Sequence, residues 1–261
     1  MPNSPWVAPW DPGSAGVADV MTFIRLAGVG RSVRLPDGSQ LEILTDINLE
    51  IDRGEHVAIV GRSGSGKSTL LNIIGLLDSP TSGLYELDGR ATLDYSARAR
   101  ARLRGATFGF VFQQFNLLPR RSATENVAAP LLYASGRQVW GRRTAAREML
   151  DRVGLGHRMD YLPERLSGGE QQRVAIARSM VRNPTVLLAD EPTGALDVDT
   201  GSLVMDMLQH VVAQSGTTLV TITHDLSVAA RADRQFRLDH GVLSPLTAEE
   251  LPSVTARREV A

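Results

Sequence analysis

The segment GRSGSGKST, from Gly61 to Thr69, constrains the fold of this chain more than any other stretch. It follows the apolar run Val57–Val60 directly, and apolar residues resume behind it. Glycine adopts backbone angles that other residues avoid, so backbone N–H groups can turn inward around a polyphosphate, and a helix that begins near Lys67 adds its positive dipole end. Lys67 can neutralise the terminal phosphates and Ser68 can offer a hydroxyl to Mg²⁺. The pattern predicts a strand, a phosphate-binding loop and a helix.

All nine residues of the segment are candidates to contact phosphate: Gly61, Arg62, Ser63, Gly64, Ser65, Gly66, Lys67, Ser68 and Thr69. The alternative interpretation is a flexible linker rich in glycine and serine. Linkers do not sit between a buried strand and an apolar helix, so the sequence context favours the phosphate-binding loop.

The overall composition limits the class of protein. The chain has 261 residues, of which 43% are hydrophobic, so a globular core can form. The formal net charge of -1 gives no overall basic field that would favour nucleic acid. The sequence contains no cysteine, which excludes disulfides, thiolate zinc sites and iron–sulfur clusters and favours a reducing cytosol. It has neither a secretory signal nor a run of about 18 apolar residues, so we expect membrane contact only through a partner.

We expect three regions along the chain. Residues 1–20 are rich in Pro, Gly and Ser and read as a flexible extension, in which Trp6 and Trp10 are the only large candidate anchors. Residues 21–244 form one α/β domain. Residues 245–261 form a charged tail.

Hydrophobic periodicity and turn residues predict the elements within the domain. The turn Pro36–Ser39 joins short β-rich runs between Phe23 and Ile51, which predicts a hairpin and an antiparallel sheet. The segment from about 114 to 166 lacks strand signals, and its helical patterns predict an inserted helical subdomain. Buried strands are expected at His56–Val60, Phe108–Phe112, Val186–Ala189 and Thr218–Ile222, and helices at Thr69–Leu77, Arg142–Val153, Glu170–Arg182 and Ser202–Ala213. This alternation predicts a largely parallel sheet.

Two acidic residues follow a buried strand. Asp190 and Glu191 end the run that begins at Val186, at the edge where open α/β sheets bind ligands. Asp190 would hold Mg²⁺, directly or through water, and Glu191 would polarise the attacking water as general base. A strand that merely ends in solvated acids is the alternative, and the upstream phosphate loop makes it the less favoured one.

A third motif is LSGGEQQR, from Leu166 to Arg173. Its Ser-Gly-Gly turn opens a helix, which creates a second anion-binding helix N-terminus with a hydroxyl beside it. Taken alone, Ser167 is interpreted equally well as an ordinary N-cap, because serine is a preferred residue there.

These ordered motifs resemble the ATP-binding subunit of an ABC transporter over roughly residues 22–243. The resemblance implies an α/β fold with a P-loop NTPase core of the ABC ATPase type, a parallel sheet, an N-terminal antiparallel β-subdomain and an inserted α-helical subdomain. It implies that Gln113 of FVFQQ contacts Mg²⁺ and the attacking water, and that His224 of TITHD contacts the γ-phosphate or that water. Asp197 corresponds to the D-loop of the family.

The family implies an ATPase that uses ATP and Mg²⁺ and works with a second copy of itself. Two subunits are expected to sandwich two ATP molecules head to tail, so that each site needs both chains. The implied site residues are Glu191, His224 and Gln113 for catalysis, Ser68, Gln113 and Asp190 for the metal, and the phosphate loop with Ser167, Gly168, Gly169, Glu170 and Asp197 for the nucleotide. Hydrolysis would remove the γ-phosphate contacts that favour the closed dimer.

Finer details resemble the MacB/LolD/FtsE-like group of the family. They are FQQFNLLP from Phe112, ATENV from Ala123 and LADEPTG from Leu188. The permeases of that group are FtsX-like, which implies a peripheral position on the cytoplasmic face of the bacterial cell membrane, with no nucleic-acid partner. The group serves efflux, lipoprotein release or mechanical activation of cell-wall hydrolases.

Two alternatives stay open at the level of sequence, an ATPase subunit of an amino-acid importer and an ABC ATPase that acts on ribosomes or nucleic acid, and a third is disfavoured. ATPases of amino-acid importers more often carry a large residue at the position of Ala189 and Ser at that of Gly194. ABC ATPases that act on ribosomes or nucleic acid usually carry two cassettes or long coiled-coil arms, and this chain has one cassette and no sustained heptads. A P-loop kinase or GTPase would have no use for LSGGEQQR.

One further feature concerns the position that would contact adenine. The family usually stacks adenine on an aromatic residue in the first strands, and the alignment puts Val33 there, which offers apolar contact without stacking.

The run from Ser96 to Arg104 carries arginine at alternate positions, and we interpret it as a solvated helix. Contact with nucleic acid or lipid headgroups is the less favoured alternative for this run.

Overall fold

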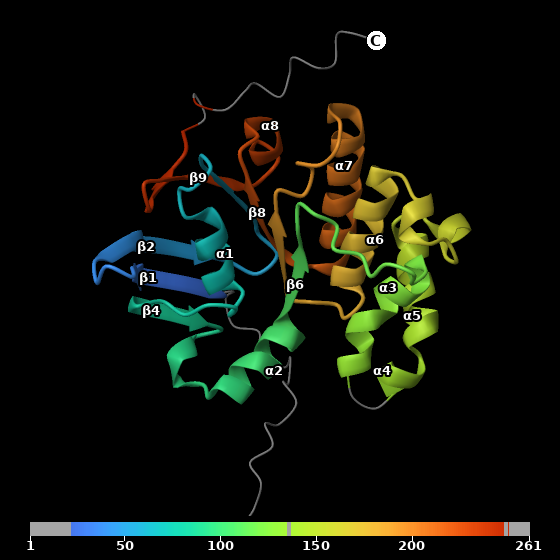
Figure 1. Ribbon diagram of the computed structural model, residues 1–261, viewed down its shortest axis with the longest axis horizontal. Helices are drawn as coiled ribbons and strands as arrows, with labels where there is room; N and C mark the ends of the chain where they lie inside the picture. Colours follow the sequence, from blue (N-terminus) through green and yellow to red (C-terminus); the bar gives the residue numbers. More distant parts are fainter. Residues whose placement is uncertain (1–21, 135–136, 248–249, 251–261) are drawn as a thin grey trace, which may run out of the picture.

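The computed structural model describes residues 22–134, 137–247 and 250, which are coloured in Figure 1. The expectations for Trp6, Trp10 and most of the C-terminal tail lie outside the described residues. Two sheets and a group of helices make up the described part, and the predicted fold class is confirmed. Within these residues, no helix combines the length and apolar character needed to cross a membrane.

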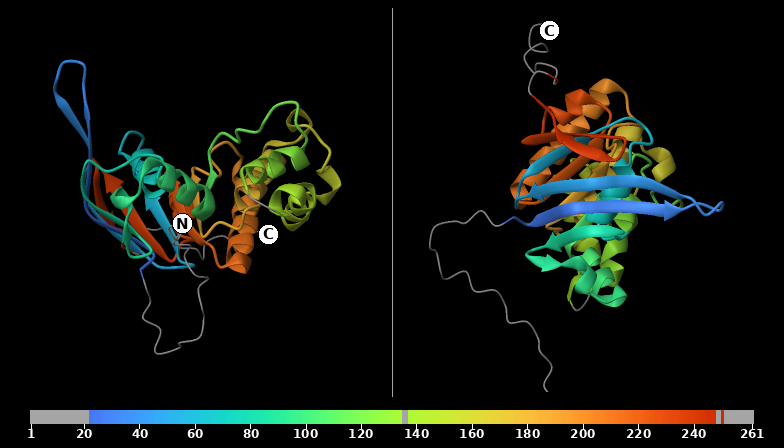
Figure 2. Two further views of the ribbon diagram at one scale, coloured as in Figure 1. Left: turned by 90° about the horizontal axis from the view of Figure 1, so that it is seen from below. Right: turned by 90° about the vertical axis from the view of Figure 1, so that its left-hand side faces the viewer.

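The N-terminal subdomain is an antiparallel sheet with the strand order β2-β1-β4-β5. Its strands are β1 (Ile24–Arg34), β2 (Gln40–Ile51), β4 (Ser82–Leu87) and β5 (Arg90–Ala91). The expected hairpin joins β1 to β2, with Gly38 in the left-handed region at φ 88° and Arg34 paired to Gln40. Its tip projects beyond the body of the molecule, as the left view of Figure 2 shows.

The larger sheet has six strands in the order β10-β9-β3-β8-β7-β6 and is parallel except at β10. The strands are β3 (His56–Val60), β6 (Phe108–Val111), β7 (Val186–Asp190), β8 (Thr218–Thr223), β9 (Arg234–Asp239) and β10 (Val242–Pro245). The four strands expected from the sequence are therefore present. Their near-continuous apolar runs reflect burial on both faces, as parallel sheets require.

Strand β7 contributes alternate side chains to two hydrophobic cores, one on each face of the larger sheet. Val186 and Leu188 pack into the core that lies between the two sheets, and helix α1 (Lys67–Ile74) contributes to the same core. Leu187 and Ala189 pack on the opposite face, against the helical part of the molecule. Successive residues of a strand point to opposite faces, so this one strand packs into both cores. This packing fixes the position of the carboxylates at the carboxyl end of the strand.

The remaining helices lie mostly on the second face (Figure 1). They are α2 (Ala97–Thr107), α3 (Ala123–Ala128), α4 (Arg137–Trp140), α5 (Arg142–Arg152), α6 (Gly168–Met180), α7 (Val198–Ser215) and α8 (Leu226–Ala229), with 3-10 helices η1 (Thr92–Asp94), η2 (Ala129–Tyr133), η3 (Gly156–Arg158) and η4 (Pro163–Arg165). The described part of residues 114–166 contains only helices and loops, as the inserted subdomain requires. Helices α3, α4 and α5 form this subdomain at the right of Figure 1.

The arginine-rich helix α2 was expected to be solvated, and half of its arginine side chains depart from that expectation. Arg98 and Arg102 are exposed, as predicted for a solvated face. Arg100 instead donates to Ser79 Oγ at 2.7 Å, and Arg104 donates to the carbonyl oxygen of Leu76 at 2.8 Å. The inner pair fastens α2 to the chain just after helix α1, where free carbonyl groups favour a cation.

The folded region extends slightly past Ser244, where the domain was expected to end. Strand β10 continues to Pro245, and Leu246 is buried against α8 and β3. Arg237 donates to Glu250 Oε1 at 2.6 Å. The buried Leu246 and the ion pair between Arg237 of β9 and Glu250 hold these residues to the sheet. Both contacts lie beyond the four-residue strand β10, so no strand periodicity predicts them.

The buried His56 makes stability depend on pH. Its Nε2 lies 3.0 Å from Thr221 Oγ1, and burial lowers the pKa of the imidazole from 6.5 to about 4, against the opposing charge of Asp233. The unfolded chain binds a proton at this residue below pH 6.5 and the native chain does not until about pH 4, so stability falls as the pH decreases through that window. We expect this residue to lower the free energy of unfolding by about 2 kcal/mol between pH 7.5 and pH 5.

Urea unfolding at the two pH values measures this effect. A His56→Gln variant should lose most of the difference that His56 causes. His157→Gln, at an exposed position in η3, is the matched control and should retain it. An identical pH dependence in wild type and His56→Gln would contradict the assignment.

Candidate active site

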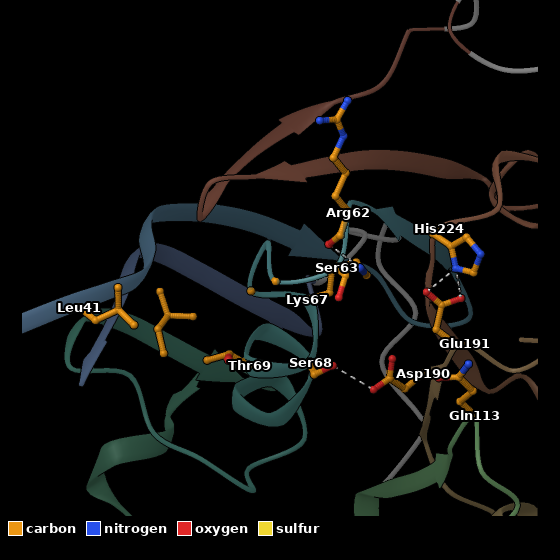
Figure 3. Close-up of a pocket in the computed structure, with 13 residues that line it drawn as sticks. Leu41, Arg62, Ser63, Lys67, Ser68, Thr69, Gln113, Asp190, Glu191 and His224 are labelled. Atoms are coloured by element: carbon orange, nitrogen blue, oxygen red, sulfur yellow. Dashed lines mark hydrogen bonds and ion pairs between the residues drawn. The ribbon is translucent and has the colours of Figure 1, made fainter. Parts of the chain in front are cut away.

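A cleft of about 830 Å³ opens at the carboxyl ends of the parallel strands (Figure 3). It is lined by Leu41, Ile43, Arg62, Ser63, Gly64, Gly66, Lys67, Ser68, Thr69, Gln113, Asp190, Glu191 and His224. The polar members come from the loop after β3 and from the ends of β6, β7 and β8. Parallel strands bring their carboxyl ends to one edge, which is why four segments far apart in the sequence meet here.

The phosphate loop is shaped by the conformation of Gly66 and by the hydrogen bonds of Lys67. Gly66 lies in the left-handed region at φ 102°, and a Cβ there would approach the carbonyl oxygen of Ile43 to 2.9 Å. Lys67 Nζ donates to the carbonyl oxygens of Gly61 at 2.7 Å and Arg62 at 2.9 Å, which curls the ammonium over the loop. The Arg62 side chain points away from Lys67 (Figure 3), so Lys67 contacts only the backbone of Arg62.

Ser68 and Asp190 face each other across the cleft. The Ser68 hydroxyl donates to Asp190 Oδ2 at 3.2 Å. Burial raises the pKa of the Asp190 carboxyl, and the charge of Glu191 adds to the rise, whereas the Ser68 hydrogen bond and Lys67 oppose it. A desolvated carboxylate beside a hydroxyl oxygen is a donor set that suits a hard divalent cation such as Mg²⁺, because the cation would compensate for the lost solvation.

Glu191 is held by the residues that end β8. His224 Nδ1 lies 2.9 Å and 3.0 Å from the two carboxylate oxygens, and Thr223 Oγ1 donates to Oε2 at 3.2 Å. The backbone of Glu191 is left-handed at φ 48°, which is uncommon for a residue with a side chain. Its N–H still donates to the carbonyl oxygen of Ile222 at 2.8 Å, so the neighbouring strand sustains this conformation.

Gln113 reaches the cleft from the end of β6. It packs directly on Gly194, where a Cβ would lie 2.9 Å from Gln113 Nε2. The glycine therefore leaves room for the glutamine at the wall of the cleft.

The LSGGEQQR motif lies outside the cleft. Ser167 is the N-cap of α6 and accepts from the Glu170 N–H at 3.3 Å, while Glu170 Oε2 accepts from the Ser167 N–H at 2.8 Å. These backbone hydrogen bonds, together with Arg158, lower the pKa of Glu170. Ser167 therefore acts as an N-cap in the single chain, and Ser167, Gly168, Gly169 and Glu170 are not among the residues that line the cleft.

Asp197 lies beside this motif and is likewise not among the cleft residues. It caps α7 by accepting from the Thr200 N–H at 3.0 Å, which also lowers its pKa. A Cβ on Gly168 would contact Leu196 at 3.3 Å, and one on Gly169 would come within 2.5 Å of Thr200. The signature turn and the D-loop thus form one packed unit, separate from the phosphate loop.

Val33 does not line the cleft. Its cross-strand partner Leu41 does, together with Ile43, on the adjacent strand of the hairpin. Figure 3 shows Leu41 on the strand that borders the phosphate loop. The alternation of apolar residues at positions 41 and 43 was the only available signal, and it does not say which strand of a hairpin borders the cleft.

Sequence reasoning also missed three polar residues around the site. Thr223 binds Glu191, Gln172 donates to the carbonyl oxygen of Pro192, and Arg178 donates to the carbonyl oxygens of Phe115 and Asn116. Each bond joins segments distant in sequence, so no local pattern could have identified its partner.

A phosphate loop that opens a helix, opposite two carboxylates at the end of a parallel strand, defines a P-loop NTPase. The family model of the ABC transporter matches residues 44–194. The chain belongs to the ABC transporter family, and the predicted ATP-binding, ATP-hydrolysing cassette is thereby confirmed.

Named relatives narrow the group to MacB- and LolD-like proteins. The chain is 50% identical over 219 residues to the macrolide export ATP-binding/permease protein MacB 1/2 of Paracoccus denitrificans, which covers 84% of this chain and 32% of that protein. It is 47% identical over 209 residues to the lipoprotein-releasing system ATP-binding protein LolD of Shewanella denitrificans, which covers 80% of this chain and 89% of LolD. The chain thus spans about a third of the MacB relative's length and most of LolD.

A solved structure shares the fold. It is the dimeric post-hydrolysis state of the ATP-binding cassette MJ0796 bound to ADP and Pi, with a TM-score of 0.76 and 41% sequence identity, and it covers 86% of this chain and 99% of that one.

Proposed function

We propose that two copies of this chain close head to tail around two MgATP, hydrolyse them, and thereby drive an FtsX/MacB-type permease from the cytoplasmic face of the membrane. One observation carries the proposal. The phosphate loop and the carboxylates line one cleft, whereas Ser167, Gly168, Gly169 and Asp197 form a separate unit on the same chain. A second copy, turned by a two-fold axis, would bring that unit to the open cleft.

The phosphate loop would bind the ATP phosphates through backbone N–H groups, Lys67 and the start of α1. Ser68, Asp190 and Gln113 would hold Mg²⁺, and their oxygen atoms suit that ion. When bound, Mg²⁺ would neutralise charge on the phosphates. Leu41 and Ile43 would contact the base with apolar surface, in place of an aromatic ring.

Glu191 would accept the proton of the attacking water as general base. Its carboxylate is fixed by Thr223 and His224, so its orientation is already set before substrate binds. His224 would contact the γ-phosphate or the water through the ring nitrogen that does not face Glu191. Gln113 would orient the same water from the end of the neighbouring strand β6.

The partner would supply Ser167, Gly168 and Gly169 to the γ-phosphate. A helix N-terminus with free N–H groups favours an anion, and the capping box with Glu170 keeps this turn rigid. Asp197, packed beside it, would meet the partner's D-loop near the dimer axis. Loss of the γ-phosphate would remove the contacts that hold the two chains together.

The helical subdomain offers a surface for the permease. Tyr133 and Trp140 are each 87% exposed, in η2 and α4, and Leu132 is 58% exposed beside them. Exposed aromatic residues are enriched at protein interfaces. The loop from Gln113 to α3 connects this subdomain to the cleft, which supports a route from ATP occupancy to the permease. The names of the relatives MacB, an ATP-binding/permease protein, and LolD, part of a lipoprotein-releasing system, agree with such a partner.

Replacing both aromatic residues tests the docking surface. The double variant Tyr133→Ser/Trp140→Ser should keep its ATPase rate as an isolated protein and lose at least about tenfold in affinity for the FtsX-type permease proposed as its partner. Leu203→Ser, at a 69% exposed position of α7, is the matched control. Co-purification of the double variant in wild-type amounts would contradict this surface.

A further inference from the structure

Helix α6 begins at the signature turn and carries two side chains that reach the loops of the cleft. Gln172 is fully buried at 0% exposure, and its Nε2 donates to the carbonyl oxygen of Pro192 at 2.6 Å. Pro192 directly follows Glu191. The bond therefore fastens the signature helix to the peptide next to the candidate general base.

The chemistry of Gln172 indicates that this bond does more than stabilise the fold. The amide nitrogen must face Pro192, because a carbonyl oxygen accepts and only the nitrogen can donate. Its other atom, Oε1, is buried without a hydrogen-bond partner among the described residues. A buried acceptor without a donor is destabilising, so an apolar side chain of equal size would suit this position better if packing were its only purpose.

Arg178 makes a comparable contact further along the helix. It donates to the carbonyl oxygen of Phe115 at 2.9 Å and to that of Asn116. Both residues follow Gln113 closely in the sequence. Gln172 and Arg178 are about 9 Å apart along the helix axis. One rigid element therefore contacts both the loop after β7 and the loop after β6.

The N-terminal end of α6 is equally well fixed. Ser167 and Glu170 form the capping box, Arg158 Nε donates to Glu170 at 3.0 Å, and Gly169 lies against Thr200. A displacement of the signature turn must therefore move the whole helix or break these contacts. Glu191 lies next to the far end of the Gln172 bond with a strained, left-handed backbone, which persists only while its surroundings hold it.

We propose that α6 links the two nucleotide sites of the dimer, and that Gln172 and Arg178 are the positioning residues of this link. The signature turn would sense the partner's ATP, and Gln172 and Arg178 would set Glu191 and Gln113 in the chain's own cleft accordingly. The inference rests on the proposed head-to-tail dimer and adds a path by which occupancy of one site regulates hydrolysis at the other.

Gln172→Met is the main test, because methionine has a similar size and carries no unpaired acceptor. We expect ATP affinity and KM to stay unchanged, kcat to fall about tenfold, and the Hill coefficient of ATP hydrolysis to fall toward one. Urea unfolding should show no loss of stability. Gln209→Met is the matched control, since Gln209 Nε2 also donates to a backbone carbonyl, that of Arg231 at 3.0 Å, away from the cleft.

Arg178→Lys provides an independent second variant. Lysine keeps the charge but cannot span both carbonyl oxygens in the same way, so kcat and the Hill coefficient should fall here too. Wild-type kcat and cooperativity in Gln172→Met and Arg178→Lys would overturn the link, even if the wild type dimerises with ATP. A wild type that neither dimerises nor shows cooperativity would instead refute the proposed function itself.

Discussion

Glu191→Gln is expected to slow ATP hydrolysis by about 10²- to 10⁴-fold while MgATP binding persists. Glutamine fills the same space and can keep one contact to Thr223 or His224, but it cannot accept the proton of the attacking water. Because the γ-phosphate would then stay in place, the closed dimer should accumulate. The expected state is an ATP-dependent dimer that dissociates only slowly.

Light scattering after size-exclusion chromatography, with and without MgATP, measures this accumulation. Glu164→Gln, at an exposed position of η4, serves as the control for the charge change and should hydrolyse ATP normally. Turnover of Glu191→Gln within a few fold of wild type would remove Glu191 from the role of general base.

Ser167→Arg is expected to abolish hydrolysis and spare ATP binding by the single chain. The substitution places a long cation at a turn that lies outside the chain's own cleft, so the phosphate loop is unaffected. In the proposed dimer the same side chain would block the turn from approaching the partner's γ-phosphate. Calorimetry should therefore give wild-type nucleotide affinity together with a steady-state rate near background.

The structure offers a matched control for the lost helix cap. Ser122 caps α3 through the same capping box, with Glu125 in place of Glu170. Ser122→Arg should lose a similar amount of stability, about 1 kcal/mol, and retain hydrolysis. Comparable loss of hydrolysis in both variants would show that the cap, and not a contact to the partner, explains the effect at Ser167.

The parts of the fold that depend on local patterns could be predicted from the sequence. The phosphate loop is contiguous in sequence, and each doubly buried strand, such as His56–Val60, is a short apolar run bounded by turn residues. Asp190 and Glu191 could be placed at the ligand-binding edge because parallel strands share that edge. Gln113 and His224 needed the family resemblance, since an isolated glutamine or histidine at the end of a strand indicates no particular chemistry.

Contacts between distant segments could not be predicted from the sequence. Strand β4 exists because β1 pairs with it, and its sequence SGLYEL carries too few apolar residues to show a period. Arg100 and Arg104 of α2 turn inward because they donate to oxygen atoms just after the end of α1. The partner of Gln172 became visible only once α6 and the loop after β7 were placed side by side.

The most direct test of the account mixes two inactive variants. A dimer of one Ser167→Arg chain and one Glu191→Gln chain contains a single site in which an intact phosphate loop and Glu191 meet an intact Ser167 from the other chain. If each site is shared between two chains, mixing the variants before ATP is added should restore hydrolysis well above the sum of their separate rates. A mixture that stays as inactive as its components would contradict the shared site, and with it the central claim of this proposed mechanism.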